Sequence, residues 1–218
     1  MYEKRHWSNP SGQSFHYLQA LPEGGGRRPL LVHLHGAGER GNEDGGELDR
    51  IALHGYFERI AKGESLPVMM VAPQCPDGRY WGGMIESLNK FLDFLLDDLN
   101  ADPARVYLTG LSMGGTGAWL WALDRPERFA AVAPVCGTGV CWYGFQLAHT
   151  PVWAFHGDLD DTVPPTESLN MVSAINRRGG NARLTLLHGV GHAAWNAAYG
   201  NNELLDWLLA QSLPRQAM

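Results

Sequence analysis

The chain has 218 residues, of which 44% are hydrophobic and 18% are charged, and this composition excludes a disordered or low-complexity protein. Its net charge of -6, with no run of basic residues longer than two, excludes the electrostatic footprint of a nucleic-acid-binding protein. The length suffices for one complete hydrophobic core, so we expect a single domain over residues 1–218.

No apolar stretch approaches the roughly 20 residues that span a bilayer, and the N-terminal sequence lacks the apolar core of a secretory signal. We therefore expect a cytoplasmic protein without a membrane span, although an export signal removed by processing would leave the same sequence. Cys75, Cys136 and Cys141 are an odd number of cysteines without metal-ligand spacing, which indicates free thiols. A bridge between Cys136 and Cys141 stays open as the alternative.

Short β-rich runs alternate with helical patterns after the first 30 residues, which is typical of a mainly parallel sheet. Several runs are continuously apolar, as strands covered on both faces are. The fold class is therefore predicted to be α/β, with a central sheet flanked by helices. The predicted strands cover residues 15–21, 30–35, 68–73, 105–110, 129–135, 152–157 and 182–188.

The clearest helix is predicted after Ser87, which is expected to be its N-cap, because five apolar residues from Leu88 to Leu99 repeat at helical spacing. Further helices are predicted over residues 113–124, 166–178 and 202–211. A segment rich in glycine and charge runs from Glu39 to Leu66 and contains a possible helix near 47–62. This segment either borders the functional site or forms a plain surface helix with long loops.

The sequence GLSMGG at residues 110–115 lies between a predicted strand and a predicted helix, the context that gives the pattern GxSxG its meaning. Gly110 and Gly114 suit a strained turn, because a Cβ at either position would collide with the neighbouring strand or helix. The turn raises the Ser112 hydroxyl above the sheet, where the dipole of the following helix stabilises developing negative charge. Ser112 is therefore the predicted nucleophile.

A serine hydroxyl needs a neighbouring base, which in this arrangement comes last in the chain, after an acidic residue. His192 follows a predicted strand inside a glycine-flanked loop, whereas His188 ends the strand itself and is expected to be structural. The acid should follow the preceding strand, where Asp158, Asp160 and Asp161 are nearly equivalent by spacing alone. One of these carboxylates is expected to fix the tautomer of the histidine ring.

Five segments, in the right order, resemble the α/β-hydrolase esterases of the phospholipase/carboxylesterase group, which includes acyl-protein thioesterases and the predicted peptidases or feruloyl-esterase-like enzymes. The segments are HLHGAGERG (33–41), APQCP (72–76), GLSMGGTGAW (110–119), VWAFHGDLDDTVP (152–164) and GVGHAAWNAAYGNNELLDWLLAQ (189–211). The resemblance spans nearly the whole chain. It implies an α/β-hydrolase fold and a serine hydrolase that cleaves carboxylic esters through an acyl-enzyme.

The resemblance also implies particular site residues. The family's HGxxDxxVP pattern falls on residues 156–164 and selects Asp160 as the acid, with Asp161 as the alternative. Its oxyanion hole falls on the backbone amides of Ala37 and Met113. These groups account for nucleophile, base and oxyanion stabilisation, so no metal or organic cofactor is expected.

Several alternatives remain at this stage. A metal pair at His33 and His35 is the alternative to a metal-free site, although no further ligand cluster accompanies it. Hydrolysis of an acyl thioester or a peptide bond by the same three residues is the second candidate activity. A non-catalytic binding protein on the same fold is the third candidate, since fold does not determine function.

The expected partner is a small-molecule ester, and nothing in the sequence indicates the oligomeric state. Residues 137–149 match no part of the family pattern, so we expect this stretch to shape the acyl pocket. Trp142 and Tyr143 within it, together with Trp195 just after His192, are the candidate walls for a small or medium acyl group or an aromatic acid. Core packing explains each of these aromatic residues equally well.

Overall fold

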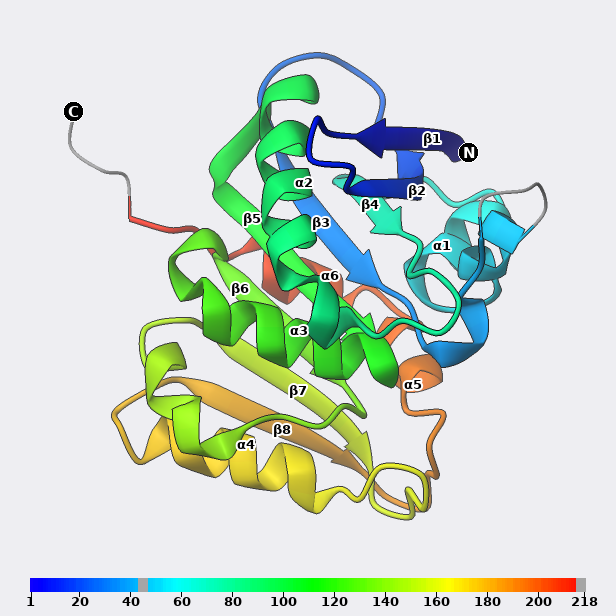
Figure 1. The fold of residues 1–218 in the computed structure, drawn as a ribbon. Coiled ribbons are helices and arrows are strands. Elements are labelled where there is room, and N and C mark those ends of the chain that lie inside the picture. The colour runs from blue at the N-terminus through cyan, green and yellow to red at the C-terminus, as the bar shows by residue number, and fades with distance from the viewer. Residues whose placement is uncertain (43–46, 215–218) are drawn as a thin grey trace.

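The computed structural model describes residues 1–42 and 47–214, and it shows a central sheet with helices on both faces (Figure 1). In this part of the chain, eight strands form one sheet in the order β1-β2-β4-β3-β5-β6-β7-β8. β2 pairs antiparallel with both β1 and β4, and all other neighbouring strands are parallel. The predicted α/β class with a mainly parallel sheet is confirmed.

Seven of the strands correspond to the seven predicted runs. The eighth strand, β1, was not predicted, because its sequence EKRHWS is charged and only Trp7 within it is buried. This strand therefore shows no apolar alternation. The strands are β1 (Glu3–Ser8), β2 (Ser14–Ala20), β3 (Arg28–Leu34), β4 (Met69–Pro73), β5 (Ala101–Leu111), β6 (Ala131–Val135), β7 (Val152–Gly157) and β8 (Ala182–Leu187).

The helices correct the sequence-based prediction at two places. Ser87 lies inside α2 and is not its N-cap, because the preceding short helix η3 continues directly into α2 at Ile85. The possible helix near 47–62 is two helices, η2 and α1, separated at His54, whose backbone is extended. The α-helices are α1 (Gly55–Ala61), α2 (Ile85–Asp98), α3 (Met113–Asp124), α4 (Thr166–Asn176), α5 (Trp195–Tyr199) and α6 (Glu203–Leu209). The 3-10 helices are η1 (Ala37–Glu39), η2 (Glu47–Leu53), η3 (Trp81–Met84), η4 (Pro126–Arg128) and η5 (Cys141–Leu147).

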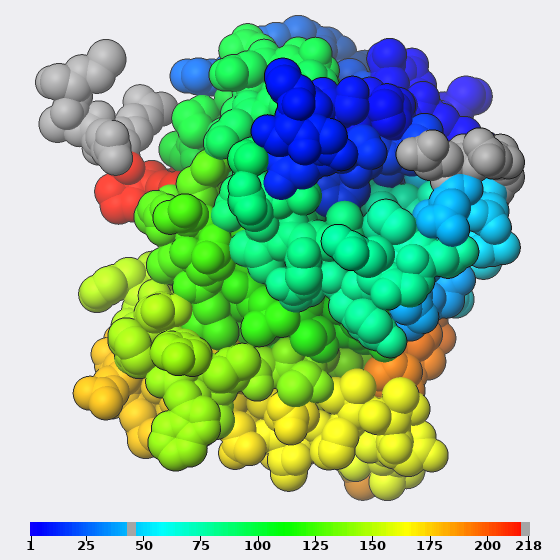
Figure 2. All heavy atoms as spheres, in the orientation of Figure 1, coloured from blue at the N-terminus to red at the C-terminus, as the bar shows by residue number. Residues whose placement is uncertain are grey.

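Two hydrophobic cores lie on opposite faces of the sheet. One is formed with α2, α3 and α4, and the other with α1, α5 and α6 (Figure 1). Neighbouring strand residues alternate between them, so that Leu30 and Val32 contribute to the first core and Leu31 to the second. In the space-filling view, the hairpin of β1 and β2 and the helix α4 lie at opposite ends of one face (Figure 2). No helix among the described residues combines the length and apolar character that crossing a membrane requires.

The parallel part of the sheet determines where a site forms. Strands β3, β5, β6, β7 and β8 run in the same direction, so the loops that follow them emerge at one edge of the sheet. These loops carry Gly36, Ser112, Cys136, Asp160 and His192. Residues separated by more than one hundred positions in the sequence are thereby brought to one place.

Two buried histidines, one on β3 and one just after it, make the fold sensitive to acid. Burial lowers the pKa of His33 to about 3 and that of His35 to about 4, from an ordinary value of 6.5. Below pH 6.5 the unfolded chain takes up protons that the folded chain does not, so folded stability falls as the pH is lowered toward 4. Each histidine contributes a loss of about 1.4 kcal/mol per pH unit in that interval.

Unfolding by urea between neutral pH and about pH 5 tests this prediction, with His33→Phe as the comparison. The His33 ring lies against Phe57 and Tyr199, and neither of its nitrogens has a hydrogen-bond partner among the described residues, so an apolar ring suits the position. The variant is expected to lose less stability on acidification than the wild type. An identical dependence on pH in the two proteins would contradict the prediction.

Candidate active site

The turn between β5 and α3 holds Ser112 in a strained backbone conformation. Its φ of 54° is in the left-handed region, which residues other than glycine rarely adopt. The Ser112 amide donates to the carbonyl of Val135 at 2.9 Å, and the Ser112 carbonyl accepts from the amide of Thr116 at 3.0 Å. The turn is thus held between β6 and the first turn of α3, in the strand-turn-helix arrangement that the sequence predicts.

Glycine is required on both sides of this serine because main chains meet there. A Cβ built on Gly114 would lie 1.9 Å from the carbonyl oxygen of Leu34, and a Cβ on Gly110 would lie 2.3 Å from the carbonyl oxygen of Gly114. Backbone atoms cannot move aside as side chains do. The predicted steric reason for these two glycines is confirmed.

Three side chains form a continuous line of hydrogen bonds at this turn. Ser112 Oγ lies 2.8 Å from His192 Nε2, and His192 Nδ1 lies 2.7 Å from Asp160 Oδ2. The other carboxylate oxygen of Asp160 accepts from the amides of Thr162 at 3.0 Å and Val163 at 2.9 Å. Burial alone would raise the pKa of Asp160, but the bonds from His192 and these two amides lower it below its ordinary value. Asp160 is therefore a buried, ionised carboxylate directed at the histidine.

The competing aspartates and the competing histidine lie elsewhere. Asp158 binds His188, with 2.7 Å between Oδ2 and Nδ1, and the His188 side chain is 98% exposed. Asp161 is exposed and accepts only from the neighbouring hydroxyl of Thr162, at 3.4 Å, among the described residues. Of the three aspartates and two histidines considered, the structure brings Asp160 and the predicted base His192 to the serine.

His156 is a functional residue that sequence reasoning left without a role. It is fully buried, and its Nε2 lies 2.9 Å from the carbonyl oxygen of Val163 and 3.2 Å from Asp160 Oδ2. A carbonyl only accepts, so Nε2 carries the proton and Nδ1 accepts from the Ser168 hydroxyl at 2.8 Å. Asp160 is thus held between two imidazole rings. The HGxxD pattern contained the signal, but the partner Ser168 on α4 appears only in three dimensions.

The two amides that the family resemblance assigns to an oxyanion hole both stand at the start of a helix. Ala37 begins η1 and Met113 begins α3. The first amides of a helix have no acceptor within it, so both can point at a developing negative charge. A Cβ on Gly36 would lie 3.6 Å from Cβ of Ser112, so the loop that follows β3 packs directly against the serine.

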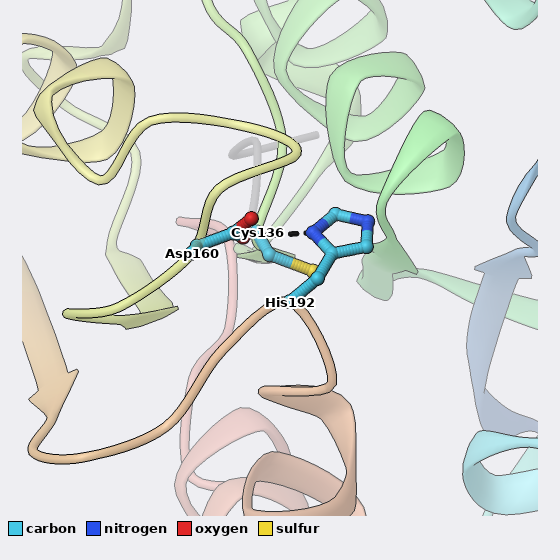
Figure 3. A group of neighbouring side chains, drawn as sticks. All are labelled: Cys136, Asp160 and His192. Atoms are coloured by element: carbon cyan, nitrogen blue, oxygen red, sulfur yellow. Dashed lines mark hydrogen bonds and ion pairs between the residues drawn. The ribbon is translucent and has the colours of Figure 1, made fainter.

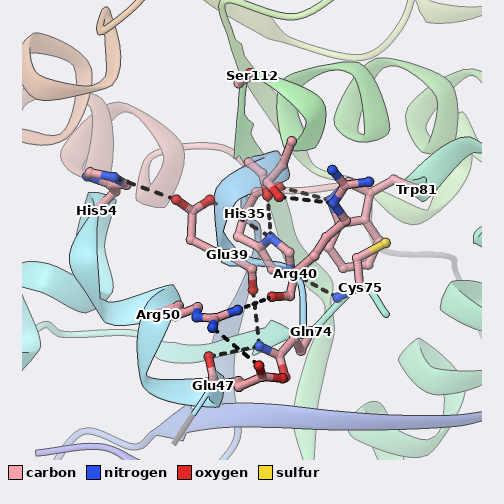
Figure 4. A network of polar contacts seen from close by, with 12 residues as sticks. His35, Glu39, Arg40, Glu47, Arg50, His54, Gln74, Cys75, Trp81 and Ser112 are labelled. Carbon is pink, nitrogen blue, oxygen red and sulfur yellow. Dashed lines mark hydrogen bonds and ion pairs between the residues drawn. The ribbon is translucent and has the colours of Figure 1, made fainter. Parts of the chain in front are cut away.

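A buried network holds this loop in place (Figure 4). His35 Nε2 accepts from the amide of Cys75 at 2.9 Å, so its Nδ1 carries the proton and donates to the carbonyl of Gly36 at 2.7 Å. Gln74 donates to the carbonyl of Glu39 at 3.0 Å. Both nitrogens of His35 are therefore engaged, and the alternative of a metal pair at this histidine and His33 has no support in the geometry.

The candidate pocket residues separate into two groups. The ring of Trp195 stands perpendicular to that of His192, with 5.4 Å between centroids, so Trp195 lies beside the predicted base. Trp142 and Tyr143 are exposed on η5, which packs on the last turns of α4, where Gly144 lies against Ala174. Since α4 runs away from the site, the structure does not bring these two side chains to the serine. These contacts do not support the expectation that the two residues line the pocket, because η5 packs along α4.

The site also contains a buried thiol, that of Cys136, which the sequence analysis did not place there. Cys136 follows β6 with a φ of 42°, and its Sγ lies within 4.8 Å of ligand atoms of Asp160 and His192 (Figure 3). Burial raises the pKa of this thiol to about 12. Cys136, Cys141 and Cys75 are all free, so no bridge joins the first two.

Comparisons with known proteins agree with this geometry. A family model described as the prolyl oligopeptidase family matches residues 143–212. The crystal structure of a thermostable esterase superposes with a TM-score of 0.84 and 30% sequence identity, over 97% of this chain and 63% of that one. Esterase PE8 superposes with a TM-score of 0.64 and 25% identity, over 88% of this chain and 97% of that one. The putative esterase NocK of Nocardia uniformis subsp. tsuyamanensis is 33% identical over 127 residues, 54% of this chain.

The chain has the α/β-hydrolase fold, and its site has the arrangement of side chains that serine hydrolases use. Within that class the chain is similar to esterases, as its five motif segments indicated. The chain spans 34% of the length of NocK and 63% of the thermostable esterase chain. The similarity therefore covers only part of these two relatives.

Proposed function

We propose that this chain hydrolyses carboxylic esters of small or medium acyl groups through an acyl-enzyme on Ser112. The observation that carries the proposal is the line of hydrogen bonds from Ser112 through His192 to the buried Asp160. A serine in a strained turn, a base within 2.8 Å and an ionised acid behind the base are the parts that nucleophilic acyl transfer needs. Similarity to esterases supports an ester as the substrate.

In the first half of the reaction, Ser112 Oγ attacks the ester carbonyl while His192 Nε2 takes the hydroxyl proton. Asp160 accepts from Nδ1 of the histidine, keeps the ring in the required tautomer and stabilises the imidazolium. The amides of Ala37 and Met113 stabilise the oxyanion. His192 then gives its proton to the departing alcohol, and the acyl group remains on the serine.

In the second half, water takes the place of the alcohol. His192 removes a proton from the water as its oxygen attacks the acyl carbon, and the same two amides bind the second oxyanion. Collapse of this intermediate breaks the bond to Ser112, which regains its proton from His192, and the carboxylic acid leaves. The surrounding residues, including His156 behind Asp160, position the acid and take no part in proton transfer.

A substrate comparison tests the proposed activity. The kcat/KM values for p-nitrophenyl acetate and butyrate are measured beside those for an acyl thioester and a peptide anilide. We expect the esters to give the highest values. Preferential cleavage of the thioester would support the thioesterase alternative, and cleavage of the anilide alone would support the peptidase alternative.

We expect Trp195 to form a wall of the acyl pocket, because its ring lies against that of His192. Trp195→Ala should change the ratio of kcat/KM between acetate and bulkier acyl esters by about 10-fold, since a lost pocket contact is worth roughly 1 to 3 kcal/mol. Trp142→Ala is the matched control, because that side chain is 86% exposed on η5. An unchanged ratio in Trp195→Ala, with a lower melting temperature, would show that Trp195 serves only packing.

A further inference from the structure

The thiol of Cys136 is a nucleophilic and metal-binding group that the proposed mechanism does not use. It is fully buried at the end of β6, and the left-handed backbone at this residue is unusual for a non-glycine side chain. Its Sγ, a carboxylate oxygen of Asp160 and a ring nitrogen of His192 all lie within 4.8 Å of one another (Figure 3). It is the one such group of three potential metal ligands found among residues 1–42 and 47–214.

The chemistry of the three groups matches a thiophilic divalent cation. Zinc binds cysteine sulfur, histidine nitrogen and aspartate oxygen, and three protein ligands leave a fourth tetrahedral position for water. A thiolate and a carboxylate together carry two negative charges, which neutralise a dication at a buried position where a net charge is costly. Calcium and magnesium prefer sites made of oxygen ligands alone, so the thiol selects against them.

The local structure lets these ligands close on an ion. Asp160 is anchored through Oδ1 by the amides of Thr162 and Val163, so Oδ2 can turn from the histidine to a metal without losing that anchor. The His192 side chain is 21% exposed, which gives the ion a way in.

We propose that Cys136, Asp160 and His192 form an inhibitory site for a thiophilic divalent cation such as zinc. Binding releases one proton to solvent, from the thiol, and the single ring proton of His192 moves from Nδ1 to Nε2 as the metal takes its place on Nδ1. A neutral ring with the metal on Nδ1 carries its only proton on Nε2. That nitrogen then has no lone pair for the Ser112 proton, so the metal-bound protein lacks its base.

Metal binding does not depend on the proposed function, whereas inhibition rests on the proposed esterase activity. The test therefore measures metal binding and inhibition separately. Cadmium, a thiophilic stand-in for zinc, is titrated while the thiolate-to-cadmium absorption in the near ultraviolet is recorded. Wild type, Ser112→Ala, Cys136→Ala and the control Cys75→Ala are compared. Cys75 is a second fully buried free thiol, and its Sγ contacts Met84 away from this cluster. Zinc inhibition of p-nitrophenyl butyrate hydrolysis is measured on the active variants.

We expect the absorption band in the wild type, in Ser112→Ala and in Cys75→Ala, and its loss in Cys136→Ala. Zinc should inhibit the wild type reversibly, and Cys136→Ala should raise the half-inhibitory concentration by at least about 10- to 100-fold, the loss that removal of even an outer-shell partner causes. A band that survives in Cys136→Ala, or equal zinc inhibition with and without the thiol, would overturn the inference.

If Cys136→Ala does not fold, Cys136→Ser serves instead, because a hydroxyl is a poor zinc ligand. A wild type with the cadmium band but no esterase activity would contradict the proposed function and not the metal site.

Discussion

Ser112→Ala is expected to reduce kcat for ester hydrolysis by about 10⁴- to 10⁶-fold, as the loss of the nucleophile does in other triad enzymes. The substitution removes the oxygen that attacks the ester and leaves His192 with no proton to accept. The turn itself depends on main-chain bonds to Val135 and Thr116, which alanine keeps. The fold should therefore be unchanged, so the far-ultraviolet circular dichroism spectrum and the melting temperature should match the wild type.

Ser11→Ala is a suitable control, because that serine is exposed in the turn between β1 and β2. It should leave kcat and stability unchanged. Retention of a tenth of the wild-type activity in Ser112→Ala would mean that another group attacks the substrate. The nucleophile assignment would then be wrong even if the protein is an esterase.

Asp160→Asn is expected to lower kcat by about 10⁴-fold. An amide nitrogen facing His192 Nδ1 donates a hydrogen bond, which favours the tautomer with the proton on Nε2, so the ring no longer accepts from Ser112. The amide oxygen can still accept from the amides of Thr162 and Val163, which bind Asp160 Oδ1 in the wild type. The loss should therefore fall on catalysis more than on folding.

Two neighbouring carboxylates provide matched controls for this substitution. Asp158 binds the exposed His188, and Asp161 contacts only Thr162 among the described side chains. Asp158→Asn and Asp161→Asn should each change kcat by less than about 10-fold, because neither carboxylate contacts the base. If Asp161→Asn were the inactive variant, the acid would lie one residue further along the chain than the structure indicates.

The strands and the nucleophile turn could be predicted because their causes are local. Continuous apolar runs specify strands buried on both faces, and the GxSxG pattern lies directly between such a run and a helical pattern. The β1 strand could not be predicted, since its pairing depends on the partner strand β2 and all of its residues except Trp7 are exposed. The same holds for the start of α2, where a preceding helix decides the boundary.

Spacing alone could not identify which aspartate is the acid, because three carboxylates follow β7 within four residues. Only the direction of each side chain separates them, and that direction is determined by the amides that capture Asp160 Oδ1. The places of Cys136 and His156 at the site were not predicted, for a related reason. Each acts through residues that are distant in the sequence, and the topology of the sheet brings those residues together. For Trp142, nearness in sequence to the site says little about its position, because η5 packs along α4 and leaves this side chain exposed.

The most direct test of Ser112 as the nucleophile is to label the protein with a fluorophosphonate probe and to identify the modified residue by peptide mass spectrometry. Such probes react with a serine only when a base activates it and an oxyanion hole stabilises the addition. We expect one adduct, on the peptide that contains Ser112, and its disappearance in Ser112→Ala. A folded wild-type protein that takes up no probe, or an adduct on any other residue, would contradict the proposal that this chain is a serine esterase acting through Ser112.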